Sequence, residues 1–103
     1  MGEAEMSDRE LLELAAKAAG IRYSDVYPNG LWAEKYDGPF GQLWNPITDD
    51  GDALRLAAKL EFMVDFREKT IVYACLPHRD FVEDQCYRRA IVRAAAEIGR
   101  AMP

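Results

Sequence analysis

The residues best suited to chemistry are the single histidine, His78, and the two cysteines, Cys75 and Cys86. Thiolate and imidazole groups bind zinc, and a cysteine beside a histidine is also the pair used in nucleophilic catalysis. A closed zinc site needs four ligands, however, and the closely spaced cysteine pairs of such sites are absent from the sequence. Cys75 also lies in an apolar segment, where burial disfavours the reactive thiolate. We therefore expect no catalytic residue, no metal site and no cofactor; a small hydrolase or metal-dependent enzyme that uses Cys75, His78 and Asp80 is the alternative.

Aromatic residues concentrate in one short segment that is rich in turn residues. Six of the eleven aromatic residues lie between positions 23 and 44, and they are Tyr23, Tyr27, Trp32, Tyr36, Phe40 and Trp44. Aromatic side chains anchor interfaces because they bury a large area at a low entropy cost. We expect a candidate interaction surface formed by Tyr27, Trp32, Tyr36 and Phe40, with Trp32 exposed. Trp44 is expected to be buried beside Asn45 and Pro46, and the alternative is that the whole set packs on one face of a sheet.

The charge balance argues against a nucleic-acid partner. The chain has 13 Lys and Arg against 18 Asp and Glu, a formal net charge of −5, whereas nucleic-acid-binding surfaces are strongly positive. The charge is also uneven: residues 1–54 hold 11 acidic and 4 basic side chains (−7), and residues 55–103 hold 7 acidic and 9 basic (+2). The basic residues near the end include Arg88, Arg89, Arg93 and Arg100. We interpret them as a solvated helix face rather than a phosphate-binding stripe.

Length and composition indicate one globular domain that spans residues 1–103. The chain is 50% hydrophobic, which is enough to bury one core at this length. No apolar run approaches the roughly 20 residues of a membrane helix, and two cysteines are too few for a disulfide framework. These features predict a cytoplasmic protein with no membrane partner.

Helical periodicity is clear in three segments, over residues 7–19, 49–60 and about 80–101. Ser7 and Glu10 have the spacing of a capping box, and Gly20 is placed to end the first helix. Thr48 or Asp49 is the expected N-cap of the second helix, and Asp80 with Glu83 repeats the capping arrangement at the start of the third. The expected buried stripes are Leu11, Leu14, Ala15 and Ala18; Ala53, Leu56, Ala57 and Leu60; and Tyr87, Ile91, Ala94, Ala95 and Ile98.

β-Branched and aromatic residues predict a β-hairpin over residues 62–76, with a polar turn at 67–69. Its second strand is apolar on both faces. We therefore expect Ile71, Tyr73 and Cys75 to face one helix layer, and Val72, Ala74 and Leu76 to face another. Residues 31–36 are predicted to form an edge strand, and the rest of 21–46 an ordered loop. The predicted fold class is α+β, with a small antiparallel sheet, made of the hairpin and the edge strand, layered between three helices.

Three segments together resemble small phage and prophage proteins of the phage ABA-sandwich domain type. In that family an N-terminal helix that ends in glycine precedes a W-x-P segment, which opens the second helix, and the terminal helix carries R-A-x-x-x-A. The matching segments are Glu10–Leu12 with Ala15–Gly20, Trp44–Leu56 and Arg89–Ala95. The resemblance implies a layered fold of helices and sheet, encoded in a temperate phage or prophage. It carries no established activity and no catalytic residue.

These observations favour a binding protein over an enzyme. We expect a phage or prophage accessory protein of unknown activity that acts in the cytoplasm of a bacterial host by binding another protein or a second copy of itself. An acidic, compact chain is suited to masking a basic, nucleic-acid-binding surface, and a host defence complex is one such target. The alternative from a third class is a structural component of the virion.

Overall fold

The fold is α+β, as the sequence predicts, but it contains two small sheets where one was expected. The computed structural model describes residues 6–34, 41–74, 76 and 80–103. Their elements are α1 (Asp8–Ala19), β1 (Tyr23–Tyr27), β2 (Gly30–Ala33), β3 (Gln42–Trp44), α2 (Asp50–Lys59), β4 (Met63–Asp65), β5 (Thr70–Tyr73), β6 (Phe81–Asp84) and α3 (Tyr87–Ala101). Strands β1, β2 and β3 form an antiparallel sheet in that order, here called sheet A; β4, β5 and β6 form a second, sheet B.

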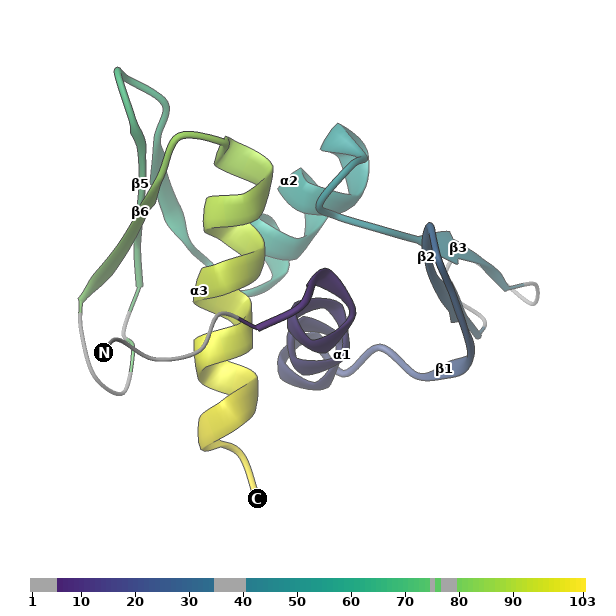
Figure 1. The fold of residues 1–103 in the computed structure, drawn as a ribbon. Helices are drawn as coiled ribbons and strands as arrows, with labels where there is room; N and C mark the ends of the chain where they lie inside the picture. Colours follow the sequence, from purple (N-terminus) through teal and green to yellow (C-terminus); the bar gives the residue numbers. More distant parts are fainter. Residues whose placement is uncertain (1–5, 35–40, 75, 77–79) are drawn as a thin grey trace.

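The helices lie between the two sheets (Figure 1). Helix α3 packs against α1 and α2 and also contacts β5 and β6, while α1 contacts β2. The central position of α3 follows from its sequence, because its buried residues cover more than one stripe of the helix. They are Ala90, Ile91, Val92, Ala94, Ala95, Ala96 and Gly99. A helix that is apolar over most of its circumference belongs in the centre of a protein. Each sheet therefore covers helices with one face only, which differs from the predicted sheet between three helices.

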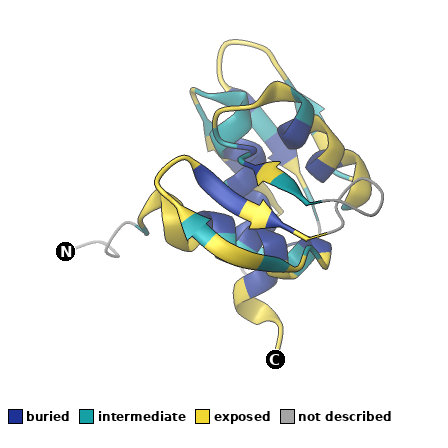
Figure 2. Ribbon diagram, turned by 90° about the vertical axis from the view of Figure 1, so that its right-hand side faces the viewer, coloured by how far each residue is buried: buried dark blue, intermediate teal, exposed yellow. Residues whose placement is uncertain are grey.

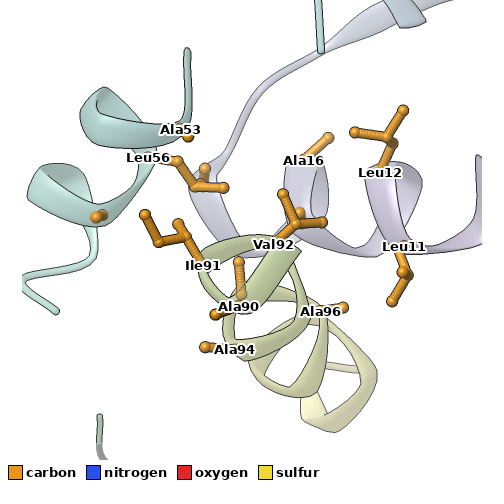
Figure 3. Close-up of a cluster of buried hydrophobic side chains, with 14 of the residues drawn as sticks. Leu11, Leu12, Ala16, Ala53, Leu56, Ala90, Ile91, Val92, Ala94 and Ala96 are labelled. Atoms are coloured by element: carbon orange, nitrogen blue, oxygen red, sulfur yellow. The ribbon is translucent and has the colours of Figure 1, made fainter. Parts of the chain in front are cut away.

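The contact between α1 and α3 is made by small side chains, which let the two helices approach closely (Figure 3). Ala15 and Ala16 on α1 and Ala95 and Ala96 on α3 are fully buried. Gly99 marks the closest point, because a Cβ atom placed there would lie 2.1 Å from the carbonyl oxygen of Leu14. No side chain fits at that position without moving the helices apart.

The ends of α1 and α2 follow the predicted signals. Ser7 and Glu10 form the capping box, and Gly20 ends α1 in the left-handed conformation at φ 71°. Asp49 caps α2 by accepting a hydrogen bond from the backbone N–H of Asp52. The buried face of α1 is rotated from the predicted stripe: Leu12, Ala16 and Ala19 are buried with Leu11 and Ala15, whereas Leu14 and Ala18 are half-buried. In the other two stripes Leu60, Tyr87 and Ile98 are likewise half-buried.

The predicted start of the third helix at Asp80 is wrong. Residues Phe81–Asp84 form β6, and α3 begins at Tyr87 with Cys86 as an N-cap that makes no side-chain capping bond. Val82 pairs with Val72 of β5 and is 1% exposed. Burial of Val82 in the sheet outweighs the local capping pattern, because an N-cap stabilises a helix by only about 0.5–2 kcal/mol.

Sheet A occupies most of the segment that was predicted to be a loop with one edge strand. Strand β2 is its centre rather than an edge, and β1 and β3 flank it. The turn at Pro28 and Asn29 joins β1 to β2. Gly30 follows with a φ of 143°, and a Cβ there would lie 2.6 Å from the carbonyl oxygen of Trp44. The part of the predicted strand beyond residue 34 lies outside the described residues.

Sheet B confirms the predicted hairpin but not its cover on both faces. Val72 is fully buried and Leu76 is 9% exposed, whereas Tyr73 is 42% exposed and Ile71 is half-buried. The face that carries Ile71 and Tyr73 therefore meets no helix layer among the described residues, because α3 packs only on the valine face. Cys75, predicted on the same face, lies outside the described residues.

Candidate interaction surface

The outer face of sheet A carries a row of exposed side chains. Strand pairing aligns Asp25 of β1, Trp32 of β2 and Leu43 of β3 across the sheet. Trp32 is 39% exposed, Leu43 37% and Tyr27, on the same face of β1, 46%. On the inner face Leu31, Ala33 and Trp44 are buried, whereas Val26 and Gln42 are half-buried. In β2 the exposed Trp32 therefore lies between two buried residues, and Figure 2 shows buried and exposed segments on one strand. We call Asp25, Tyr27, Trp32, Glu34 and Leu43 the sheet A surface.

These positions agree with the sequence analysis as far as the structure describes them. Trp32 is exposed and Trp44 is buried, as predicted, and Tyr27 is exposed. Tyr36 and Phe40, the other two predicted members of the surface, lie outside the described residues. The sequence analysis did not include Leu43 in this surface. Its pairing with Trp32 depends on the register of β3, which the local sequence does not specify.

The indole of Trp32 rests on the backbone of Gly41. A Cβ atom at Gly41 would lie 2.5 Å from Nε1 of Trp32 and 2.8 Å from the carbonyl oxygen of Ala33. Any side chain at residue 41 would therefore displace the ring. Glycine thus holds the indole against the sheet while 39% of the residue stays exposed, and a ring fixed in this way loses little freedom on binding.

Two carboxylates on the sheet A surface lack an ion-pair partner among the described residues. These are Asp25, paired with Trp32 across the sheet, and Glu34, which follows Ala33 at the end of β2. The backbone N–H of Glu34 donates to the carbonyl oxygen of Arg22, 2.8 Å away, so Arg22 is the neighbour of Glu34 across the strands. The exposed aromatic residues are thus accompanied by two carboxylates that form no ion pair with the described residues.

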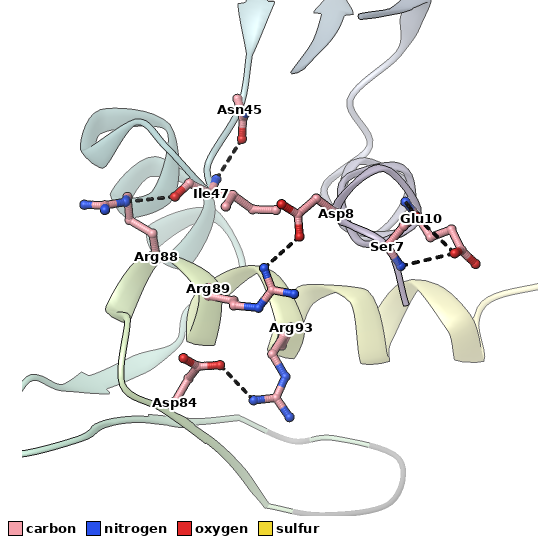
Figure 4. A network of polar contacts seen from close by, with 9 residues as sticks. All are labelled: Ser7, Asp8, Glu10, Asn45, Ile47, Asp84, Arg88, Arg89 and Arg93. Atoms are coloured by element: carbon pink, nitrogen blue, oxygen red, sulfur yellow. Dashed lines mark hydrogen bonds and ion pairs between the residues drawn. The ribbon is translucent and has the colours of Figure 1, made fainter. Parts of the chain in front are cut away.

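The arginines of α3 are all paired, in contrast. Arg88 contacts Asp50 at 2.7 Å. Arg89 contacts Asp8 at 2.7 Å, and Arg93 contacts Asp84 at 3.0 Å (Figure 4). Arg100 lies 3.9 Å from Glu97. The first three pairs connect α3 to the start of α2, the start of α1 and β6, and the fourth lies within α3. The basic cluster therefore stabilises contacts between elements instead of presenting a positive surface.

Asn45 and Asp52 fix sheet A relative to the helices. The Asn45 side chain donates to the carbonyl oxygen of Asn29, at 2.9 Å, and accepts from the N–H of Ile47, at 3.0 Å. The N–H of Asn45 donates to the carboxylate of Asp52, a residue that is 4% exposed, and this carboxylate also accepts from Arg55. The turn between β1 and β2 and the start of α2 are thereby joined. The sequence analysis places Asn45 and Pro46 beside a buried Trp44, but it does not predict the role of Asp52.

Tyr23 connects the inner face of sheet A to α1. Its hydroxyl donates a 2.9 Å hydrogen bond to Glu13. Partial burial, together with that hydrogen bond and the charge of Glu13, raises the pKa of Tyr23 above its ordinary value. The tyrosine is therefore neutral at physiological pH and serves as a structural donor.

A hollow of about 530 Å³ lies at the turn end of sheet A, beside the sheet A surface. Its lining is mixed polar and apolar and comes from α1, from sheet A and from the turn before α2, and Tyr27 is one of the lining residues. The lining residues are Asp8, Arg9, Leu12, Val26, Tyr27, Pro28, Asn29, Leu31, Asn45, Ile47 and Thr48. Tyr27 is the residue that this hollow shares with the sheet A surface.

One cluster of interacting titratable groups lies away from this surface, where α2 and α3 begin. The hydroxyl of Tyr87 donates to Asp50, and Arg88 donates to the same carboxylate and to the carbonyl oxygen of Ile47. The hydrogen bonds from Tyr87 and Arg88 lower the pKa of Asp50, and the bond to Asp50 raises the pKa of Tyr87. These groups stabilise one another's resting protonation states, which suits a structural tether and not proton transfer.

Of the three residues considered for metal binding or catalysis, the structure describes Cys86 but not Cys75 or His78. Cys86 is a half-buried free thiol at the N-cap of α3. Within the described residues no group of three His, Cys, Asp or Glu side chains is placed to hold a metal ion. Cys75 and His78 lie outside those residues, so their predicted lack of a chemical role stays a prediction.

Comparison with known proteins gives no family to which the chain can be assigned: no family model, curated protein or solved structure matches it. The resemblance to phage ABA-sandwich proteins therefore stays a prediction. Among the described residues, no helix is long and apolar enough to cross a membrane.

Proposed function

We propose that this protein is a non-catalytic binding protein whose sheet A surface holds a basic, arginine-containing surface of another protein. The observation that carries the proposal is the combination of exposed Tyr27, Trp32 and Leu43 with two carboxylates, Asp25 and Glu34, that have no ion-pair partner among the described residues. Aromatic anchors and unpaired charges of one sign on the same face are features of an interface for a partner of opposite charge.

The chemistry of this face suits guanidinium groups. An arginine side chain stacks on an indole through a cation–π contact and forms two parallel hydrogen bonds with a carboxylate. The sheet A surface offers the indole of Trp32 and the carboxylate of Asp25 on neighbouring strands. The net charge of −5 adds long-range attraction, which raises the rate of encounter with a basic partner and weakens with salt.

A phage or prophage accessory role in a bacterial host is the biological form of this proposal. An acidic protein that covers a basic surface competes with nucleic acid for it, and a host defence complex is a target of that kind. The phage origin rests only on the sequence motifs at Glu10–Leu12 with Ala15–Gly20, at Trp44–Leu56 and at Arg89–Ala95. The fold adds no support for it, because here the helices lie between two sheets.

Trp32 provides a fluorescence probe for binding at the sheet A surface, because it is exposed whereas Trp44 is buried. Tryptophan fluorescence is followed while a short peptide of alternating arginine and alanine is added at low salt, with a glutamate–alanine peptide as the charge control. We expect saturable binding of the arginine peptide only. The variant Trp32→Ala lacks this fluorescence signal, so its binding is measured with a dye attached to the peptide. We expect it to bind the arginine peptide at least about tenfold more weakly than the wild type.

A matched pair of double variants separates a local site from overall charge. Asp25→Asn with Glu34→Gln removes two negative charges from the sheet A surface, and Glu61→Gln with Glu68→Gln removes two elsewhere. The first pair should weaken peptide binding at least about tenfold and the second by less than about twofold. Equal losses in the two double variants, or unchanged binding by Trp32→Ala, would refute the proposed site.

A further inference from the structure

A second row of exposed apolar side chains crosses the outer face of sheet B. Strand pairing aligns Met63 of β4 with Tyr73 of β5, and Tyr73 with Phe81 of β6. Met63 is 68% exposed, Phe81 46% and Tyr73 42%. The rings of Tyr73 and Phe81 are neighbours, with centroids 6.4 Å apart. The row is therefore continuous across all three strands of the sheet.

The opposite face of sheet B already has its cover. Val64, Val72 and Val82 form the next row, on the face toward α3, and Val72 and Val82 are buried there. No described residue covers the outer row, and in Figure 1 sheet B lies at one side of the molecule. An antiparallel sheet with one solvated face normally carries polar residues there. Three large apolar residues in one row indicate an interface.

We propose that this face binds the same face of a second copy and forms a two-fold symmetric dimer. An interface between identical copies must be self-complementary, with each residue facing either itself or a residue whose contact is repeated by symmetry. A single straight row centred on Tyr73 meets this condition, because two copies can lay their rows against each other with Tyr73 at the centre. Face-to-face packing of two open sheets is also the usual way in which such a face is buried.

The acidic residues beside the row select the orientation of the two copies. Asp65 and Glu83 flank Ile71 in the neighbouring row, so both carboxylates lie on one side of the apolar row, and Asp65 has the exposed Arg67 3.7 Å away. A two-fold axis parallel to the strands would bring the carboxylates of the two copies face to face. An axis along the row itself places them at opposite ends of the interface, where they do not repel. The second arrangement stacks Tyr73 of one copy on Tyr73 of the other.

The edge of sheet B is less suited to this association than its face. Arg93 donates a 3.1 Å hydrogen bond to the carbonyl oxygen of Glu83 on the edge strand β6, and also pairs with Asp84. It thereby occupies an acceptor that an added strand would need. Natural sheets use charged side chains at an edge to prevent such pairing.

The size of the row sets the strength of the dimer. With about 200 Å² of surface for each large side chain, the exposed fractions of Met63, Tyr73 and Phe81 amount to roughly 300 Å² per copy. The apolar core of the dimer interface is then about 600 Å², and with a polar rim the total approaches about 1,000 Å². Stable interfaces start near about 1,200 Å². The dimer is therefore weak and dissociates on dilution.

Sedimentation equilibrium over a concentration series tests this inference, which does not depend on the proposed site on sheet A. The apparent mass of the wild-type protein should rise from 11.7 kDa toward twice that value as the concentration increases. Tyr73→Lys should stay monomeric, because two lysines would meet at the centre of the interface. Trp32→Lys, which places the same charge on sheet A, should associate like the wild type.

Amide NMR spectra of the wild-type protein over a dilution series test the dimer interface without a variant. The shifts that change with concentration should belong to Met63, Ile71, Tyr73 and Phe81. A wild-type protein that stays at 11.7 kDa up to about millimolar concentration, the range of the weakest specific contacts, would overturn the inference. So would a dimer that Tyr73→Lys leaves intact, or concentration-dependent shifts confined to sheet A.

Discussion

Replacement of Gly99 by alanine should destabilise the protein although alanine is the better helix former. Gly99 lies in α3 where that helix crosses α1, and an added Cβ would lie 2.1 Å from the carbonyl oxygen of Leu14. Ordinary van der Waals contacts between a Cβ atom and another heavy atom begin near 3.4 Å. Because the obstacle is backbone, it cannot rotate away. The two helices must separate by about 1.3 Å, the difference between these distances, and their contact through buried alanines must loosen.

The magnitude follows from two opposing effects. Overpacking of a buried contact costs about 1–3 kcal/mol, and the upper end applies because a rigid helix backbone has to move. Alanine recovers about 1 kcal/mol through its helix propensity. The expected net loss is about 2 kcal/mol, which lowers the melting temperature of a domain of this size by roughly 10 °C.

Gly51 offers a matched control for this prediction. It lies in the first turn of α2, and a Cβ there would meet only the movable side chains of Arg55 and Asp49, at 3.1–3.2 Å. Gly51→Ala should leave stability unchanged or raise it by up to about 1 kcal/mol. Urea unfolding of both variants measures the difference. If Gly99→Ala is as stable as Gly51→Ala, the close crossing of α1 and α3 is not the packing described here.

The remaining predictions concern the core and one ion pair. Val72→Asp should cost at least about 3 kcal/mol, because Val72 is fully buried between sheet B and α3 and a carboxylate there is unpaired; a variant that melts at the wild-type temperature would contradict this. Trp44→Ala should lose about 3–5 kcal/mol and Trp32→Ala less than about 1 kcal/mol, so equal melting losses would remove the distinction between a buried and an exposed tryptophan. The pKa of Asp50 is lowered below its ordinary 3.8 by hydrogen bonds from Tyr87 and Arg88, so its contribution to stability is present above that pH and is lost as the pH falls through the lowered pKa. Wild type should thus exceed Asp50→Asn in stability at pH 7, with the advantage vanishing in acid; an advantage that stays constant down to pH 2 would rule out this ion pair as its source.

The sequence predicts elements well where local signals and burial agree. The Ser7–Glu10 capping box with Gly20, and Asp49 before α2, mark helix ends through hydrogen bonds within a few residues, and all of them form. The strong β-propensity of Ile71 to Tyr73 likewise produces a strand at the centre of sheet B. Trp32 and Trp44 were also assigned to the surface and the core correctly.

The errors arise where a distant contact decides the structure. A capping pattern at Asp80 and Glu83 is local, but Val82 gains more by pairing with Val72 than a helix turn offers, so a strand forms. Strands β1 and β3 depend on contacts that are distant in sequence, namely their pairing with β2, the burial of Trp44 and the hydrogen bond from Tyr23 to Glu13. For the same reason the row of Asp25, Trp32 and Leu43 could not be predicted. Its members come from three strands whose register the local sequence does not specify.

The central claim, that the sheet A surface binds basic protein segments, is tested most directly by chemical-shift mapping. Isotope-labelled wild-type protein is titrated with the arginine–alanine peptide, and amide and indole N–H signals are followed. The claim predicts saturable shifts of the Trp32 indole and of the amides of Asp25 and Leu43, with the Trp44 indole unchanged. An unmoved Trp32 indole, with the shifts located on α3 or sheet B instead, would contradict it.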